Sequence, residues 1–200
     1  MAAFIKGFLL GFSLILAIGA QNAFVIRQGL RNAHVLAVCL TCAVSDAILI
    51  AVGVAGFGRI AEAAPWITPV FRWGGAAFLL VYGVMSLRSA WQGGQAMGDE
   101  GDVTQSVFRA VLTSLAFTWL NPHVYLDTLV LVGSVAASLG EGRLAFGAGA
   151  VTASFVFFFS LGYGARRLAP AFRSPRAWRA LDAGVGLLLL VLAAILAFGA

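Results

Sequence analysis

Charged residues are scarce in this chain. They make up 10% of its 200 residues, whereas about a quarter of the residues in an ordinary soluble domain are charged. Hydrophobic residues make up 61%, and the one conspicuous hydrophilic stretch spans residues 92–105. The chain therefore has no room for a soluble catalytic module, and we predict that it is not an enzyme.

Cysteine is almost absent as well. Cys39 and Cys42 are the two cysteines, and they lie in a C-x-x-C spacing inside an apolar run. A tetrahedral metal site needs two further ligands, and no second cysteine pair supplies them. His123 and Asp127 share a helix face at a spacing of four, but they provide only two ligands. We therefore predict no metal and no cofactor, and we interpret both cysteines as small apolar residues of a helix face.

Acidic residues are fewer than basic ones, 8 against 13, which gives a net charge of +5. The basic residues lie mainly at the ends of apolar runs, so they form no folded basic surface, and we exclude a nucleic-acid partner. The connections after the first, third and fifth runs hold the larger share of them. This asymmetry predicts that those connections face the cytoplasm and that both termini lie on the opposite side.

Long apolar runs dominate what is present. Each is near the 20 or so residues that an α-helix needs to cross the hydrocarbon core of a bilayer. The sequence therefore predicts an all-α integral membrane protein with six transmembrane helices, in contact with a lipid bilayer. The runs cover residues 4–26, 35–57, 70–88, 107–135, 144–165 and 180–199.

The polar stretch divides the chain into two halves. Residues 92–106 form a predicted linker between a first three-helix repeat, 1–91, and a second, 107–200. Asn22 and Asn121 occupy equivalent places in the two halves, about half a chain length apart. A repeat with three crossings inserts its second copy upside down, so we predict two inverted repeats, the plan of many secondary transporters.

Polar residues interrupt the first and fourth apolar runs. Pro122 lacks an amide proton, so Asn121 is expected to cap a new half-helix that begins at Pro122. Gly19 and Asn22 are expected to break the first run in the same way, with Asn22 as the cap. The N-terminus of a half-helix attracts a carboxylate. We therefore predict that Asn22 and Asn121, together with Gln21, contact the substrate.

Two acids lie inside apolar runs. An aspartate near the bilayer centre costs about 2.5–3.5 kcal/mol on insertion scales, and such residues usually face a pathway or a partner. Asp46 and Asp127 are therefore candidates for binding a cationic substrate and for carrying a proton. Tyr125 is a further candidate for lining the same cavity. Asp182 is assigned to a solvated helix end, and Arg27 is the expected internal partner of an acid.

Several motifs resemble the lysine exporter (LysE) family, and within it the branch of arginine exporters. The similarity runs the whole length of the chain, including the Ser174-Pro175 loop, and one of the motifs is Ser45-Asp46. The family usually carries proline where this chain has Ala20, so the first break is expected to depend on Gly19 and Asn22. The longer matching segments are Gly19-Ala20-Gln21-Asn22-Ala23-Phe24-Val25-Ile26-Arg27-Gln28-Gly29, Arg72-Trp73-Gly74-Gly75-Ala76-Ala77-Phe78-Leu79-Leu80 and Thr118-Trp119-Leu120-Asn121-Pro122-His123-Val124-Tyr125-Leu126-Asp127.

The resemblance implies export of basic L-amino acids, arginine or lysine, across a bacterial cytoplasmic (inner) membrane. We predict a secondary transporter with proton antiport, in which the carboxylate of the substrate lies near Asn22 and Asn121 and its cation near Asp46 or Asp127. The alternatives are an exporter of neutral amino acids, an intramembrane enzyme and a passive channel. The 24 glycines permit close helix packing within one chain or in a homodimer, and they do not distinguish the two.

Overall fold

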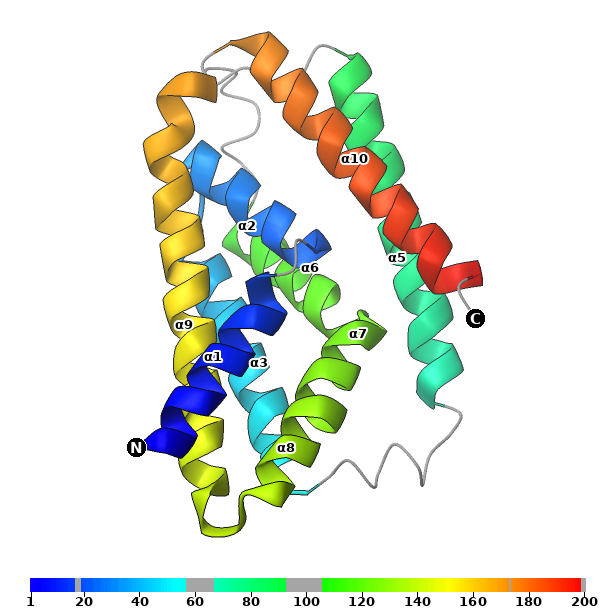
Figure 1. The fold of residues 1–200 in the computed structure, drawn as a ribbon. Coiled ribbons are helices and arrows are strands. Elements are labelled where there is room, and N and C mark those ends of the chain that lie inside the picture. The colour runs from blue at the N-terminus through cyan, green and yellow to red at the C-terminus, as the bar shows by residue number, and fades with distance from the viewer. Residues whose placement is uncertain (17–18, 57–66, 93–105, 173, 199–200) are drawn as a thin grey trace.

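The computed structural model describes residues 1–16, 19–56, 67–92, 106–172 and 174–198. Every regular element in these ranges is a helix (Figure 1). The first half contributes α1 (Ala2–Leu16), α2 (Ala20–Arg31), α3 (Val35–Val54) and α5 (Ile67–Trp91). The second half contributes α6 (Val107–Trp119), α7 (Pro122–Tyr125), the π-helix η1 (Leu126–Val132), α8 (Gly133–Ser138), the 3-10 helices η2 (Gly140–Gly142) and η3 (Ala169–Phe172), α9 (Arg143–Leu168) and α10 (Pro175–Phe198).

Three helical segments are long and apolar enough to cross a membrane. They are Val35–Val54, Gly140–Leu168 and Pro175–Phe198, and α1 with α2 adds a fourth if the bent pair is one span. These helices indicate a multi-pass membrane protein. The predicted run 70–88 lies inside α5, and the predicted run 107–135 is divided among α6, α7, η1 and α8. Most of the predicted linker lies outside the described residues, so the boundary between the halves stays a prediction.

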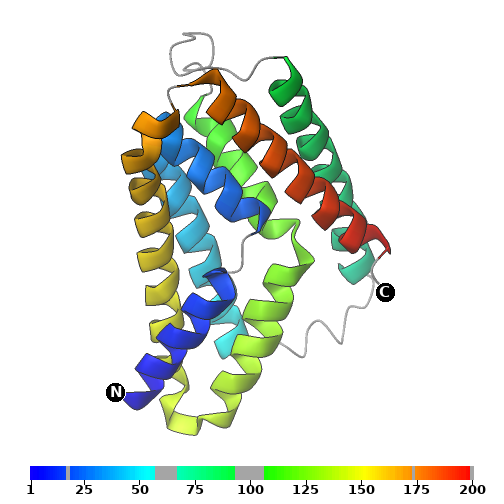
Figure 2. The same ribbon diagram turned by 45° about the horizontal axis from the view of Figure 1, so that its top comes forward.

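The helices form a main bundle and a separate pair. In the bundle, α9 packs against α1, α2 and α3, while α3 also packs against α6, η1 and α8. α5 and α10 pack along each other and lie at one side of the bundle (Figures 1 and 2). Aromatic rings join the two parts: Phe117 of α6 lies 4.9 Å from Phe78 of α5 and 5.5 Å from Phe24 of α2, between ring centroids.

Glycine allows a close contact between α1 and α9 in the bundle. A Cβ atom added at Gly7 would collide with the backbone carbonyl of Phe146, and one added at Gly149 would collide with that of Phe4. The two helices therefore meet backbone to backbone, as small residues permit in membranes. This contact fixes α1 on α9 and so sets where the first helix break lies.

Candidate functional site

The first break separates α1 from α2, whose axes make an angle of 81°. α2 begins at Ala20, after Gly19 in an extended conformation (φ −116°, ψ 177°), and no side chain caps it. The prediction that Asn22 caps this helix is wrong, because Asn22 is the third residue of α2. Its amide nitrogen instead donates to the carbonyl of Ile15, at 2.8 Å. The last carbonyls of any helix lack partners within it, and Asn22 supplies one across the break.

The second break separates α6 from α7. α7 begins at Pro122, and the carbonyl of Thr118 accepts from the amide of Asn121 at 3.4 Å. The Tyr125 hydroxyl donates to the carbonyl of Trp119 at 2.6 Å. A side chain of the following half-helix thus reaches back to the end of the preceding helix, as at the first break.

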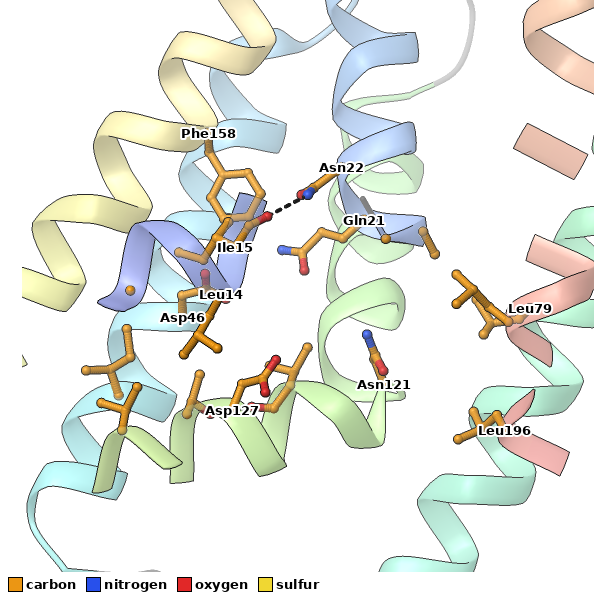
Figure 3. Close-up of a pocket in the computed structure, with 18 residues that line it drawn as sticks. Leu14, Ile15, Gln21, Asn22, Asp46, Leu79, Asn121, Asp127, Phe158 and Leu196 are labelled. Carbon is orange, nitrogen blue, oxygen red and sulfur yellow. Dashed lines mark hydrogen bonds between the residues drawn. The ribbon is translucent and has the colours of Figure 1, made fainter. Parts of the chain in front are cut away.

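A cavity of about 280 Å³ lies where the two breaks meet. Side chains from both halves of the chain line it (Figure 3). Five of the six predicted substrate-binding residues line it, and the sixth, Tyr125, does not. The polar lining residues are Gln21, Asn22, Asp46, Asn121, Asp127 and Thr128, and the apolar ones include Leu14, Ile15, Ile50, Leu79, Val124, Phe158, Leu192 and Leu196.

Asp46 is the most buried acid of this cavity, at 5% exposure. One oxygen of its carboxylate, Oδ2, accepts from the hydroxyl of Ser154 on α9, at 2.8 Å. The neighbouring Ser45 accepts from the indole nitrogen of Trp119, at 3.2 Å. The end of α6 is therefore tied to α3 beside Asp46. These bonds hold the carboxylate in place at the cavity wall.

Asp127 approaches the cavity from η1, the π-helix that follows α7. π-helices are rare and occur often at functional sites, because the extra residue per turn shifts side chains and frees backbone groups. A Cβ atom at Gly53 of α3 would collide with the carbonyl of Thr128, so η1 lies directly against α3. The π-helix thereby places Asp127 on the same cavity as Asp46 (Figure 3).

Gln21 brings a hydrogen-bond donor to the cavity. Its side chain is 9% exposed, and its amide nitrogen, Nε2, has no hydrogen-bond partner among the described residues. Figure 3 shows the side chain reaching from the start of α2 into the space above Asp46 and Asp127. A buried donor without a partner costs free energy, which a bound acceptor would recover. This wall of the cavity therefore suits an anionic oxygen.

The prediction that Asp182 of α10 lies at a solvated helix end is also wrong. Asp182 is fully buried, with 0% exposure, rather than solvated at a helix end. Arg27 of α2 lies 3.3 Å from it, so this arginine pairs with Asp182 and not with Asp46 or Asp127. The helical spacing of Trp178, Val185 and Leu189, all buried, places Asp182 on the same face of α10. That spacing is visible in the sequence and could have identified the acid as buried.

Metal-ligating side chains do not cluster in the part of the chain that the structure describes. No group of three or more His, Cys, Asp or Glu residues there has the geometry to hold an ion. Cys39 and Cys42 are both buried and free, and the thiol of Cys39 donates to the carbonyl of Phe158 at 3.2 Å. The side chain of His123 lies outside the described part, so its predicted face-sharing with Asp127 stays a prediction.

Known proteins of similar sequence cover nearly the whole chain. YggA of Aeromonas salmonicida is 46% identical over 202 residues, which cover 100% of this chain and 97% of that protein. The arginine exporter protein ArgO of Klebsiella pneumoniae is 41% identical over 184 residues (92% and 87%). ArgO of Salmonella enteritidis is 40% identical over 191 residues (95% and 90%). No solved structure matches the chain.

The family comparison agrees with these relatives and with the motifs at both helix breaks. The family model described as LysE type translocator matches residues 12–199. The match includes all six lining residues that are polar and both helix breaks. The chain therefore belongs to the LysE type translocator family.

Proposed function

We propose that this protein is a secondary transporter that exports basic L-amino acids, arginine or lysine, from the bacterial cytoplasm across the inner membrane. One observation carries the proposal: a single cavity presents Gln21 and an uncapped helix N-terminus together with two acids, Asp46 and Asp127. A basic amino acid has a carboxylate and a side-chain cation, which need donors and acids respectively. The relatives named arginine exporter support arginine as the first substrate to test.

The carboxylate of the substrate fits the wall formed by the start of α2. A helix N-terminus carries a partial positive charge, and no side chain caps this one. The Gln21 amide nitrogen lies on the same wall without a hydrogen-bond partner among the described residues. Both features favour an anionic oxygen, and the α-carboxylate of every amino acid provides one.

The cation of the substrate fits the part of the cavity wall that carries the two acids, Asp46 and Asp127. Asp46 keeps its position through Ser154, and Asp127 is carried by the π-helix. The cavity, about 280 Å³, is near the lower end of the range for small-molecule sites, about 300–1,000 Å³. It is the size class expected for an amino acid rather than for a lipid or a peptide.

The packing of the helices supports the inverted repeat. In the first half, α1 and α2 pack on α9, the middle long helix of the second half. In the second half, α6 and η1 pack on α3, the middle long helix of the first half. α5 and α10, the last helix of each half, pack on each other. Exchange of the two halves leaves this scheme unchanged, as a twofold relation between repeats requires.

Proton antiport follows from the cost of moving a cation outward. With the cell interior negative, this movement costs about 2.3 kcal/mol per 100 mV for each charge. Exchange for an incoming proton cancels the electrical cost. Asp46 and Asp127 are the acids of the cavity that can bind either a proton or the substrate cation, one after the other.

The test is export by purified protein in proteoliposomes. We expect saturable movement of labelled arginine and lysine, stimulated by a pH gradient, with threonine and homoserine transported at least tenfold less well. If the neutral amino acids were transported equally well, the proposal of a basic substrate class would be wrong. Saturable arginine transport that ignores the pH gradient would refute the proton coupling alone. Flux without saturation would indicate a channel.

A further inference from the structure

A buried polar contact joins the main bundle to the pair α5–α10. Arg27 of α2 lies 3.3 Å from Oδ1 of Asp182 on α10, and the hydroxyl of Ser89 on α5 donates to Oδ2 of the same carboxylate at 2.7 Å. The side chain of Arg27 is 14% exposed and that of Asp182 is 0% exposed. One carboxylate therefore holds side chains from both α2 and α5.

α2 and α10 meet again one helical turn away from the ion pair. The guanidinium of Arg31 lies over the ring of Trp178, 5.2 Å from its centroid. Arg27 and Arg31 are four residues apart on α2, and Trp178 and Asp182 are four residues apart on α10. The two contacts thus lie along one line where α2 and α10 run in opposite directions. An intramembrane ion pair costs free energy to bury, which makes a functional role the default interpretation.

The cavity lies at the same boundary, between the main bundle and the pair α5–α10. Leu79 of α5 and Leu192 and Leu196 of α10 form one wall, and the main bundle forms the others. At about 1.5 Å per residue, Arg27 lies roughly 7.5 Å along α2 from the cavity residue Asn22, and Asp182 lies roughly 15 Å along α10 from Leu192. The ion pair is therefore beyond one end of the cavity, at the boundary between the two parts.

The last turns of α2, α5 and α9 carry arginines, namely Arg31, Arg88, Arg166 and Arg167. The C-terminal ends of α2 and α5 and the N-terminal end of α10 face the same end of the molecule, which is called the arginine-rich side below (Figure 1, top). They lead into the connections that the distribution of basic residues predicts to be cytoplasmic. The opposite ends of α5 and α10 have no such charged contact in the described residues.

We infer that Arg27 and Asp182 form a gate on the arginine-rich side of the cavity. When the pair is closed, it holds α2 against α5–α10. Substrate reaches the cavity from that side only after the pair separates and α5–α10 moves away from α2. This inference rests on the proposed transport function, and it assigns to Arg27 and Asp182 a role in access rather than in substrate binding.

The first test reads access without any substrate. Ala20 lines the cavity, so Ala20→Cys in a Cys39→Ala/Cys42→Ala background reports access when everted membrane vesicles receive a membrane-impermeant maleimide. We expect Arg27→Gln and Asp182→Asn to increase the labelling rate at least threefold, and Arg27→Lys to keep it near the parent rate. Arg88→Gln and Glu141→Gln change exposed charges and serve as matched controls, with no change expected. Unchanged labelling in both neutral variants, each recovered in the membrane, would overturn the gate.

The second test locks the gate. Arg27→Cys/Asp182→Cys, joined by a short thiol cross-linker that a reductant can cleave, should lose more than 90% of arginine transport and regain it on reduction. The two single-cysteine variants should keep their transport after the same treatment. Continued transport by the cross-linked protein would overturn the inference. Failure of the parent protein to transport arginine would refute the proposed substrate instead, and the labelling test would still decide the gate.

Discussion

At the first helix break, the chain starts its new half-helix with Ala20, whereas at the second break it starts with Pro122. Both breaks leave carbonyl groups that need donors. Asn22 donates across the first break, to Ile15, and Tyr125 donates across the second, to Trp119. Within a membrane such groups must find partners in the protein. A polar side chain that bridges the break is therefore common to both, whereas a proline is present at only one.

The two breaks also differ in what they present to the cavity. The first presents donors, through the uncapped start of α2 and the amide of Gln21. The second leads into the π-helix and presents the carboxylate of Asp127, near Asp46 of α3. Two breaks of similar origin thus form walls of opposite preference. An amino acid with a cationic side chain needs both walls.

The largest effect is expected at the acidic wall. Asp46→Asn and Asp127→Asn should each lower the transport efficiency for arginine about 100-fold, or roughly 2.7 kcal/mol. Removal of one partner of a buried charge pair commonly costs about 2–5 kcal/mol. Transport rates in proteoliposomes at several arginine concentrations give the efficiency, and Glu141→Gln, an exposed acid, is the control. If both variants stayed within twofold of the parent protein, neither acid would bind the substrate cation.

Much of this arrangement could be predicted from the sequence, because polar residues within apolar runs are rare. Asp46, Asp127 and the two breaks were visible for that reason. The hydrogen bond of Asn22 could not be predicted, because the carbonyl of Ile15 comes within its reach only through the 81° bend between α1 and α2. The π-helix also escaped prediction, since one additional residue per turn leaves no pattern in an apolar run. Asp182 lies near the start of a run, where a solvated helix end was expected, but its helical spacing from Trp178, Val185 and Leu189 could have placed it on the buried face of α10.

The second effect concerns the bridges across the breaks. Asn22→Leu and Tyr125→Phe each remove a donor from a carbonyl at the end of a helix. The loss of one such bond costs about 1–3 kcal/mol when the acceptor is left buried without a partner. We expect both variants to lower the thermal unfolding temperature in detergent, by similar amounts. Thr152→Ala removes an exposed hydroxyl that bonds within its own helix and should change the temperature least. A stable Asn22→Leu with an unstable Tyr125→Phe would show that the breaks are held differently.

The third effect concerns the donor wall. Gln21→Leu removes the amide nitrogen that has no hydrogen-bond partner among the described residues. A hydrogen bond to a charged group contributes about 1.5–3 kcal/mol, so we expect the KM for arginine to rise at least tenfold. Agmatine, which is arginine without its carboxylate, should be affected little. Competition of each compound against labelled arginine measures this difference, and an equal loss for both would remove Gln21 from carboxylate binding.

The smallest effect comes from making the two breaks alike. Ala20 is the first residue of α2, where proline is favoured because the helix does not use that amide. Gly19 before it is already extended, with φ −116° and ψ 177°, close to the conformation that a following proline requires. Ala20→Pro should therefore stabilise the protein by about 0.4–1 kcal/mol, mainly by restricting the unfolded chain. Pro122→Ala should lose a similar amount at the other break. Thermal unfolding of the two variants and of the double variant measures both changes. Destabilisation by Ala20→Pro would mean that the first amide of α2 donates to a partner that proline cannot serve. The protein would then need a residue other than proline at this break.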